Sequence, residues 1–427
     1  MNAHCPGLIR GRLGWLYGRR IHLSAVATLM VTGGCGGDVD EGIETTRRSV
    51  VIRDSAGVVI TEMTEPVGNG IRWHVGDTPI LTIGEDLRAS AEYQFESING
   101  AIRLPEGGVL VADGALLREY GEGGRYLRTW GRRGEGPGDF RFIGGVHKWG
   151  ADSVVVWDRF SRRLTVFDTN GTLGRTTARN EARQLVLRGV IGRERFVFER
   201  VVNFNVNQLM TSWNEREEYE RLSGFVEVWD ATGQPVVIIG PYPHAEYFTR
   251  KGPDMFLGLV RYSRNMITGV WGSLVIAGPN DTYELRAHGS DGEMERVIRL
   301  DRPPVVSEDR HRRALLEENP EDDPDIPMAS TLPLFDRVIG DELGYLWVRD
   351  YDMPGETTVA WTVFDSAGVI ATRLGMDDGL RIWKIGRNYI LASQVGEVGI
   401  EAVVVLSLDR GAKLRQADQW PAAGRIP

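Results

Sequence analysis

Six basic residues recur at similar places in successive apolar segments of the chain. They are Arg103, Lys148, Arg188, Arg264, Arg337 and Lys384. Arg103 and Lys148 lie 45 positions apart, in the same register as the apolar segments around them. If these side chains converge, they create a focused positive potential that suits a carboxylate or a phosphate. The alternative is that each cation pairs with a nearby acidic side chain or lies in solvent at the rim, and the sequence leaves both open.

Other motif-based chemistry is absent from the sequence. There is no G-x-S-x-G nucleophile motif, no phosphate-binding P-loop and no H-E-x-x-H metal motif, so no catalytic residue is assigned. The two cysteines, Cys5 and Cys35, both lie near the N-terminus. Apart from His4 and His22 near the N-terminus, the histidines are scattered along the chain, at His74, His147, His244, His288 and His311. None of them pairs at a metal-ligand spacing, so the sequence predicts no metal site and no cofactor.

The elements that would position the cations form a repeat with a period near 45 residues. Each unit has a short apolar strand and then a second one that closes on a turn with aspartate first and glycine fourth, as in 168–171 and 230–233. Aspartate caps the turn amides and glycine accepts positive φ. Second strands are predicted at 109–113, 154–158, 195–199, 274–277, 345–349 and 389–393, and third strands at 116–120, 163–168, 225–230, 283–288, 359–365 and 402–409. This pattern predicts an all-β fold, a six-bladed β-propeller with four-stranded blades.

The residues before the first blade are predicted to complete the ring. Residues 80–84 match the ends of the fourth strands at 128–131 and 237–240. They should supply the outer strand of the last blade, so that an N-terminal strand closes the propeller. The hairpin at 50–60 either pads this closing blade or belongs to a partial seventh blade, and the sequence leaves both open.

Two insertions, 201–223 and 301–334, are predicted to project from one face. Loops between second and third strands, and loops between blades, emerge at the same end of an antiparallel four-stranded blade. Each insertion is expected to carry a helix, one capped by Ser307 and ended by Pro320, the other over 215–222. Long insertions in a compact fold usually build or cover a site, the alternative being tolerated surface loops. The loops 131–140 and 241–253 share this face and supply four candidate ligand contacts: Arg132, Arg133, His244 and Tyr247.

The N-terminus has the features of a secretory signal. Basic residues precede a short apolar core at 23–31 that is too short to span a bilayer. Residues 32–35 (Thr-Gly-Gly-Cys) resemble a bacterial lipobox, although Thr32 departs from its usual Leu or Val. We expect a signal at 1–34, acylation of Cys35, a flexible tether at 35–48 and a propeller at 49–420. The protein would then be lipid-anchored in the cell envelope, at the outer membrane or in the periplasm; a simple cleaved signal is the alternative.

The net charge of the chain limits the classes of molecule that it is expected to bind. The formal net charge of −9 argues against nucleic acid, which is usually bound by a basic stripe. The expected partners are therefore the membrane through the lipid anchor and a small molecule or a protein, and we expect a monomer.

The loop at 132–140, after a fourth strand ending in Trp130-Gly131, resembles the G-x-G-P-G-E-F loop of bacterial six-bladed propeller lipoproteins related to NHL repeats. Residues 53–57, 335–338 and 344–348 are also similar to such proteins. The resemblance implies a binding platform that holds a small ligand, an anionic one included, or a protein partner on its loop-rich face. Some six-bladed relatives are metal-dependent lactonases or lyases. For this chain the resemblance implies that alternative with calcium or zinc at the channel mouth, for which Asn99, Asn265 and Glu199 are candidates.

Overall fold

The computed structural model describes residues 50–64, 73–84, 90–179, 184–201, 218–250, 256–354, 356–396 and 399–411. All of them belong to one unit of the chain, Arg47–Pro427. The predicted signal, Cys35 and the tether lie outside the described residues, as does the end of the predicted propeller beyond 411. In the part of the chain that is described, no helix is long and apolar enough to cross a membrane.

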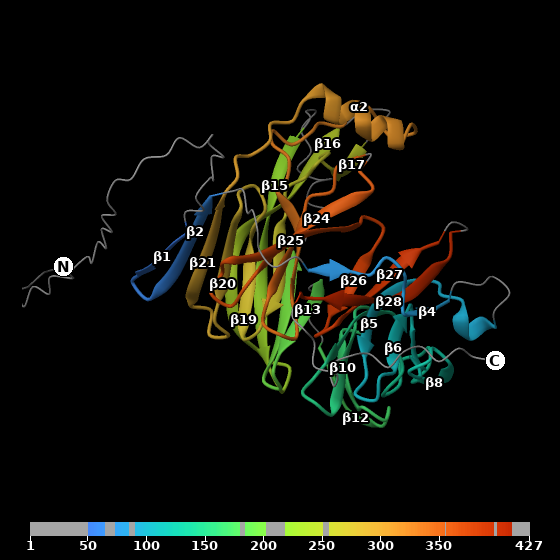
Figure 1. Cartoon of the computed structure of the whole chain (residues 1–427). Helices are drawn as coiled ribbons and strands as arrows, with labels where there is room; N and C mark the ends of the chain where they lie inside the picture. The colour runs from blue at the N-terminus through green and yellow to red at the C-terminus, as the bar shows by residue number, and fades with distance from the viewer. Residues whose placement is uncertain are drawn as a thin grey trace, which may run out of the picture. The chain divides into compact units, whose positions relative to one another are not determined.

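The described strands form six sheets, and each sheet is one blade (Figure 1). Blade one contains β5 (Ile98–Arg103), β6 (Val109–Asp113), β7 (Leu116–Tyr120) and β8 (Tyr126–Trp130). Blade two contains β9 (Ile143–Lys148), β10 (Ser153–Asp158), β11 (Arg163–Asp168) and β12 (Leu173–Ala178). Blade three contains β13 (Leu185–Ile191), β14 (Arg195–Val201), β15 (Glu218–Asp230), β16 (Pro235–Arg250) and β17 (Phe256–Leu259).

The other three blades follow in the same order along the chain. Blade four contains β18 (Met266–Trp271), β19 (Leu274–Pro279), β20 (Glu284–His288) and β21 (Met294–Asp301), extended by β2 (Val58–Thr64) and β1 (Val50–Ser55). Blade five contains β22 (Phe335–Gly340), β23 (Leu346–Asp350), β24 (Thr358–Phe364) and β25 (Ile370–Asp377). Blade six contains β26 (Arg381–Ile385), β27 (Tyr389–Val395), β28 (Glu401–Asp409), β4 (Leu81–Ile83) and β3 (His74–Val75). The described helices are the short η1 (Ala91–Tyr93) and α2 (Asp309–Glu318).

The ring is closed as the sequence predicts. The inner strands contact one another in the cyclic order β5, β9, β13, β18, β22, β26 and back to β5. In blade six, β4 pairs antiparallel with β28, from Ile83 opposite Val403 to Leu81 opposite Val405. The outer strand of the last blade therefore comes from the N-terminal part of the chain.

The core lies between the blades. Each pair of adjacent blades shares one cluster of buried apolar side chains, and all six such clusters occur among the described residues. Trp157 and Trp229, for example, fill the space between blades two and three. Because both faces of each sheet are covered, its strands are rich in Val, Ile and aromatic residues rather than alternating with polar ones.

The predicted turn chemistry is present. Asp168 Oδ1 accepts hydrogen bonds from the amides of Asn170 and Thr172, at 2.9 and 2.8 Å. Gly171 closes this turn with a φ of +78°, a conformation that costs little without a side chain. The turns that begin at Asp230 and Asp365 repeat the same contacts.

The hairpin near residues 50–60 departs from both sequence alternatives. It joins blade four, where β2 pairs parallel with β21 from Val59 opposite Arg296 onward. Burial explains the position, because Met63 enters the apolar cluster between blades four and five. Thr61 Oγ1 also donates to the carbonyl of Ala367 at 3.0 Å. The hairpin neither pads the closing blade nor forms part of a seventh.

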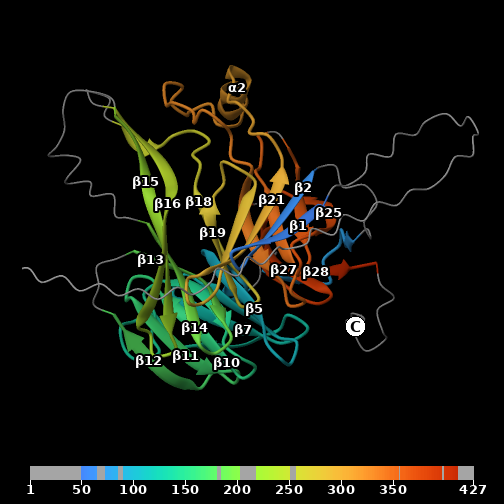
Figure 2. The ribbon, with the colours of Figure 1, turned by 90° about the vertical axis from the view of Figure 1, so that its left-hand side faces the viewer.

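The first insertion differs from its prediction. The expected helix at 215–222 is wrong where the chain is described, because Glu218–Leu222 belong to β15. They pair with β16, Tyr219 opposite Phe248 and Glu220 opposite Tyr247. The predicted loop at 241–253 is likewise strand as far as Arg250. β15 and β16 thus form a hairpin that runs well past the rest of the blade (Figure 2), and we call its outer part, 218–223 and 241–250, the arm.

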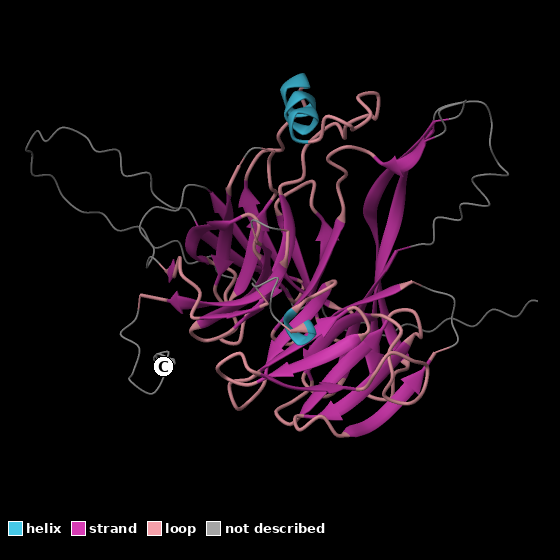
Figure 3. Ribbon diagram, turned by 90° about the vertical axis from the view of Figure 1, so that its right-hand side faces the viewer, coloured by secondary structure: helices cyan, strands magenta, loops and turns pink. Residues whose placement is uncertain are grey.

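The second insertion carries α2, as predicted, but with a different cap. Glu308 occupies the N-cap, its side chain accepts from the amide of His311, and His311 Nδ1 accepts from the Glu308 amide at 2.9 Å. The sequence favoured Ser307, one residue earlier. Figure 3 shows α2 and the arm at the same end of the propeller. The insertion that carries α2 contacts the arm there through an ion pair between Asp323 and Arg250 at 2.5 Å and through the small cluster of Phe248, Val260 and Ala329.

Candidate functional site

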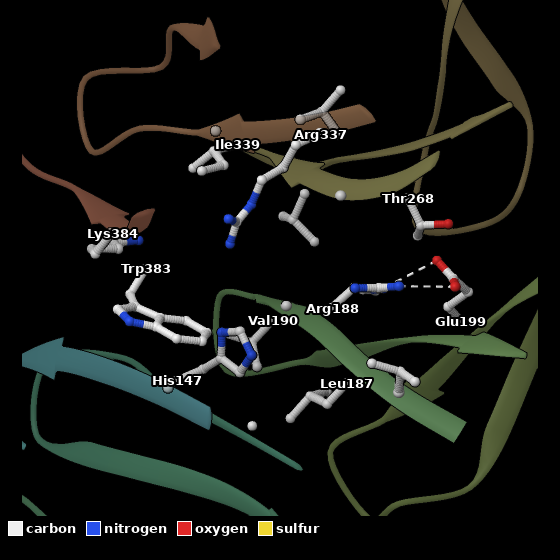
Figure 4. A pocket seen from close by; sticks show the side chains of 18 of the residues that line it. His147, Leu187, Arg188, Val190, Glu199, Thr268, Arg337, Ile339, Trp383 and Lys384 are labelled. Carbon is white, nitrogen blue, oxygen red and sulfur yellow. Dashed lines mark hydrogen bonds and ion pairs between the residues drawn. The ribbon is translucent and has the colours of Figure 1, made fainter. Parts of the chain in front are cut away.

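The inner strands enclose a cavity of about 450 Å³. Every one of the six inner strands contributes to its lining, so the cavity occupies the central channel. The side chains that line it include cations, carboxylates, aliphatic groups, an imidazole and an indole (Figure 4). A space of this size fits a small molecule.

β-bulges aim several side chains at this cavity. In five inner strands the register with the second strand skips one residue, which is left out of the ladder. The skipped residues all line the cavity: Asn99, Gly144, Arg188, Asp336 and Trp383. A bulge re-orients a side chain without ending the strand, and bulges recur beside binding and active sites.

Arg337 is the central cation of the site. It projects from β22 into the cavity (Figure 4), and among the described residues it makes no hydrogen bond or ion pair. Burial lowers the pKa of its guanidinium to about 10; the positive charge of Arg381 acts in the same direction, the negative charge of Asp336 opposes it, and that of Arg188 adds to the lowering. A bound anion would stabilise the charged form of a half-buried guanidinium on which two more positive charges act.

Arg188 is held by an acidic partner. Its Nε and Nη2 atoms donate to the two oxygens of Glu199, at 3.0 and 2.9 Å (Figure 4). Burial alone would raise the pKa of Glu199, but Arg188 first and His244 second lower it to about 2. His244 Nε2 lies 3.6 Å from Glu199 Oε1. The carboxylate is therefore ionised, and its two hydrogen bonds from Arg188 fix the orientation of that guanidinium.

A second group of basic side chains lies on β9 and β26. Lys148 Nζ is 3.5 Å from Glu342 Oε1, whereas Lys384 makes no hydrogen bond or ion pair to any described residue. Burial lowers the pKa of Lys384; the negative charge of Glu342 opposes this lowering, and the positive charge of Lys148 adds to it. His147 lies beside Lys384; burial and then that neighbouring charge lower the pKa of the imidazole to about 4, so it is neutral at physiological pH.

The cavity carries an excess of positive charge. Five cations line it, namely Lys148, Arg188, Arg337, Arg381 and Lys384, against the three acids Glu199, Asp336 and Asp341. Asp336 is paired with Arg349 and Asp341 with Arg410, and neither of those arginines lines the cavity. Two of the acids are thus neutralised from outside. The result is a positive cavity within a chain of formal net charge −9.

Two of the six predicted channel cations lie elsewhere. Arg103 is buried at the end of β5, donates to the Gly107 carbonyl at 2.7 Å and stacks on the ring of Tyr389. Arg264 precedes β18 and binds the buried carboxylate of Glu246. Neither lines the cavity, because both are engaged by groups outside it. The structure places the other four, Lys148, Arg188, Arg337 and Lys384, in the lining.

Arg381 and Trp383 line the cavity but are not among the site residues predicted from the sequence. Arg381, at the first position of β26, donates to the Ile98 carbonyl at 3.4 Å and lies over the ring of Trp383 at 4.3 Å. The sequence pattern singles out one cation in each inner strand, and in β26 that cation is Lys384. Extending the repeat register to the first residue of each strand would have found Arg381, whereas Trp383 depends on a bulge that the sequence does not announce.

The predicted contacts of the loop face do not form one site. Arg132 pairs with Asp139 at 3.2 Å, and Arg133 lies 3.7 Å from Glu96; both side chains are largely exposed. His244 and Tyr247 are in the strand β16, not in a loop. His244 is buried, and its Nδ1 accepts from the Ala245 amide at 2.6 Å.

The candidates for a metal have other partners. The amide nitrogen of Asn99 donates to the Ser97 carbonyl at 3.1 Å, and that of Asn265 donates to the Ser263 carbonyl at 2.9 Å. Glu199 binds Arg188. Within the described ranges, no three or more side chains of His, Cys, Asp or Glu gather in a way that could hold a metal ion.

Comparison with known proteins adds three likenesses of fold. No family model matches the sequence, and no curated protein does. An exported protein from Bacteroides fragilis is 9% identical over 82% of this chain and 99% of its own, with a TM-score of 0.44. A DUF4221 family member from Bacteroides vulgatus is 10% identical over 80% and 99%, with a TM-score of 0.47. A calcium-binding regucalcin from Agrobacterium tumefaciens is 10% identical over 74% and 92%, with a TM-score of 0.38. At these identities function has to be argued from the site's own residues.

Proposed function

We propose that this β-propeller is a cell-envelope protein that binds a small anionic ligand in its central channel. The observation that carries the proposal is Arg337, a guanidinium that faces the cavity without an ion pair to any described residue; the charges of Arg381 and Arg188 act on it, and that of Asp336 opposes them. A planar guanidinium presents several donors in a fixed fork and matches a carboxylate or phosphate group.

The proposal accounts for a cost in the fold. Keeping a half-buried cation without an ion pair is unfavourable, and proteins normally avoid it by pairing the cation or by replacing it with an apolar residue. Strain of this kind persists where it serves a site. An anion that enters the cavity would provide the charge that Arg337 lacks, while the fixed Arg188–Glu199 pair and the Trp383 ring would limit its size and shape.

Binding of small anions to purified protein tests the proposal. Sulfate, phosphate and benzoate should each raise the melting temperature in a saturable manner, because a ligand that binds only the folded state stabilises it by mass action. Arg337→Met should remove this stabilisation. The matched control is Arg125→Met, an exposed arginine on the turn before β8, which should keep it. Equal anion responses in the two variants would overturn the proposal.

Location in the envelope rests on the N-terminal segment, which lies outside the described residues. The proposal is that Cys35 is acylated and anchors the propeller to a membrane. Cys35→Ser should move the protein from the membrane fraction to the soluble fraction without changing its melting temperature. Wild-type protein that is entirely soluble in cell fractions would contradict the anchor.

The alternative of a metal-dependent hydrolase or lyase has no observation in its favour among the described residues. It would be revived by stoichiometric calcium or zinc in the purified protein. A protein partner on the face that carries α2 and the arm remains compatible with a ligand in the channel, since the two would use different surfaces.

A further inference from the structure

The two lysines of the channel are unusual for the composition of the chain. Only four of its 50 Lys and Arg residues are lysines, namely Lys148, Lys251, Lys384 and Lys413. Two of the four, Lys148 and Lys384, line the cavity, and the other two lie outside the described residues. An arginine would supply the same positive charge, but its guanidinium stays protonated in proteins. A lysine can lose its proton and act as a nucleophile, so these positions allow a chemistry that arginine does not.

Lys384, on β26, lines the cavity with an amine that makes no hydrogen bond or ion pair to any described residue. The negative charges of Glu342 and Asp341 act on it, but both carboxylates have other partners. Glu342 Oε1 lies 3.5 Å from Lys148 Nζ. Asp341 Oδ2 accepts from Arg410 at 2.8 Å. The Lys384 amine is therefore accessible to a molecule that enters the cavity.

The surroundings of Lys384 favour its neutral form. Burial is the largest influence and lowers the pKa of the amine, and the positive charge of Lys148 acts in the same direction. Desolvation and a neighbouring cation are the two ways in which proteins activate a lysine as a nucleophile. His147 lines the same cavity (Figure 4), and its imidazole, with a pKa of about 4, is neutral. A neutral imidazole has a nitrogen that can accept a proton from the amine.

The cavity suits a small oxo acid in size and charge. Its volume is about 450 Å³, and the excess of cations over acids in its lining attracts a carboxylate. Apolar side chains, among them Val190 and Ile339, also line it and favour the neutral amine over the ammonium ion. A compound that carries both a carboxylate and a carbonyl group matches these features together.

From this arrangement we infer that Lys384 is a nucleophilic amine that binds a small oxo acid covalently in the channel, as an imine. The nitrogen attacks the carbonyl carbon, a C–N bond forms, and one N–H proton passes to the carbonyl oxygen to give a carbinolamine. The second N–H proton then leaves with the hydroxyl group as water, and a C=N bond replaces the C–O bond. Water reverses both steps, so no oxidant, reductant or cofactor is needed. Covalent binding goes beyond the proposed function, and the choice of an acid rests on it.

Reductive trapping on the full-length protein tests the inference. Pyruvate and sodium borohydride convert the imine into a stable secondary amine, whose added mass is that of pyruvic acid less one oxygen atom. Peptide mapping by mass spectrometry then measures the label at each lysine. Lys384 should carry at least about tenfold more label than Lys251 or Lys413, because a desolvated amine is the better nucleophile at neutral pH. Equal label at all lysines, or none at Lys384, would overturn the inference; a melting temperature that sulfate still raises would leave the proposed function intact.

Two variants of Lys148 test the activation of Lys384. Lys148→Gln removes the neighbouring positive charge and frees Glu342 to pair with Lys384. Lys148→Arg retains the charge, so its Lys384 should be labelled at least about tenfold faster than that of Lys148→Gln. Equal labelling rates in the two variants would contradict an amine activated by its surroundings.

A neutral ketone tests the acid. Hydroxyacetone has the carbon skeleton of pyruvate with a hydroxymethyl group in place of the carboxylate. The label at Lys384, divided by that at Lys251 to correct for intrinsic reactivity, should be at least about threefold larger with pyruvate, because a positive cavity concentrates anions. Equal ratios for the two compounds would overturn the assignment of an oxo acid, and the response of the melting temperature to sulfate would show separately whether the cavity binds anions.

Discussion

The sequence predicts both Arg264, next to blade four, and Arg337, in blade five, as channel cations. The structure gives Arg264 a buried acidic partner and Arg337 none among the described residues. Arg264 donates through its Nε and Nη2 atoms to Glu246, a carboxylate with no exposed surface, and through Nη1 to Thr331 Oγ1 at 3.1 Å. Hydrogen bonding to Glu246 raises the pKa of the Arg264 guanidinium. Arg337 has no such partner among the described residues, and burial lowers its pKa to about 10.

The difference separates a structural cation from a binding one. The Arg264–Glu246 pair joins β16, within the arm, to the segment that enters β18, and Tyr219 of β15 also donates to Glu246. Every donor there has an acceptor within the protein, so a ligand has nothing to add. In the channel Arg337 has donors without acceptors among the described residues, so a bound molecule can supply the missing acceptors.

The largest expected change in stability comes from breaking the Arg264–Glu246 pair. Glu246→Gln should lower the free energy of unfolding by about 3–5 kcal/mol, because it leaves the half-buried Arg264 without its counter-charge. Urea denaturation measures the loss. The control is Glu220→Gln on the adjacent strand β15, where the side chain is exposed and the change should stay within about 0.5 kcal/mol. A similar, small effect in both variants would show that the pair does not hold the arm.

A smaller effect of opposite sign is expected in the channel. Arg337→Met should leave the free energy of unfolding of the empty protein unchanged or raise it by about 1 kcal/mol, because it removes a half-buried charge that makes no ion pair to the described residues. The same urea titration, repeated with saturating sulfate, should show a gain for wild-type protein and none for the variant. If Arg337→Met destabilises the empty protein as strongly as Glu246→Gln does, Arg337 is a structural cation and the comparison fails.

Local chemistry explains what the sequence could predict. The six blades follow from turns such as 168–171, in which aspartate and glycine encode the hairpin without help from distant residues. Closure by β4 also follows, because its sequence repeats the fourth-strand pattern. These elements are determined by residues close to them in the chain.

Distant partners explain what the sequence could not predict. Nothing within 50–64 announces that Met63 fits between blades four and five, where the other residues lie more than two hundred positions away. Residues 218–222 have no helical or strand preference that outweighs the pairing offered by β16. Arg264 was misplaced for the same reason, since whether Glu246 reaches it depends on the register of the arm. A shift of one residue exchanges a channel side chain for a buried one.

The smallest expected effect concerns Asp336, the acidic neighbour of Arg337. Burial, which outweighs the contact with Arg349, raises the pKa of Asp336 to about 6. A raised carboxyl pKa means that the stability contributed by the protonated form is present at low pH and is lost as the pH rises through about 6. Between pH 8 and pH 5 the cavity therefore gains positive charge, while His147, with a pKa of about 4, stays neutral.

Sulfate keeps its charge over this range, so its affinity should rise by about two- to fivefold on acidification, as expected for one charge acting through a high effective dielectric. Asp336→Asn should bind sulfate at pH 8 as tightly as wild-type protein does at pH 5, with little further change on acidification. Calorimetry at both pH values decides it: a variant with the same pH dependence as wild-type protein would show that Asp336 does not control the charge next to Arg337.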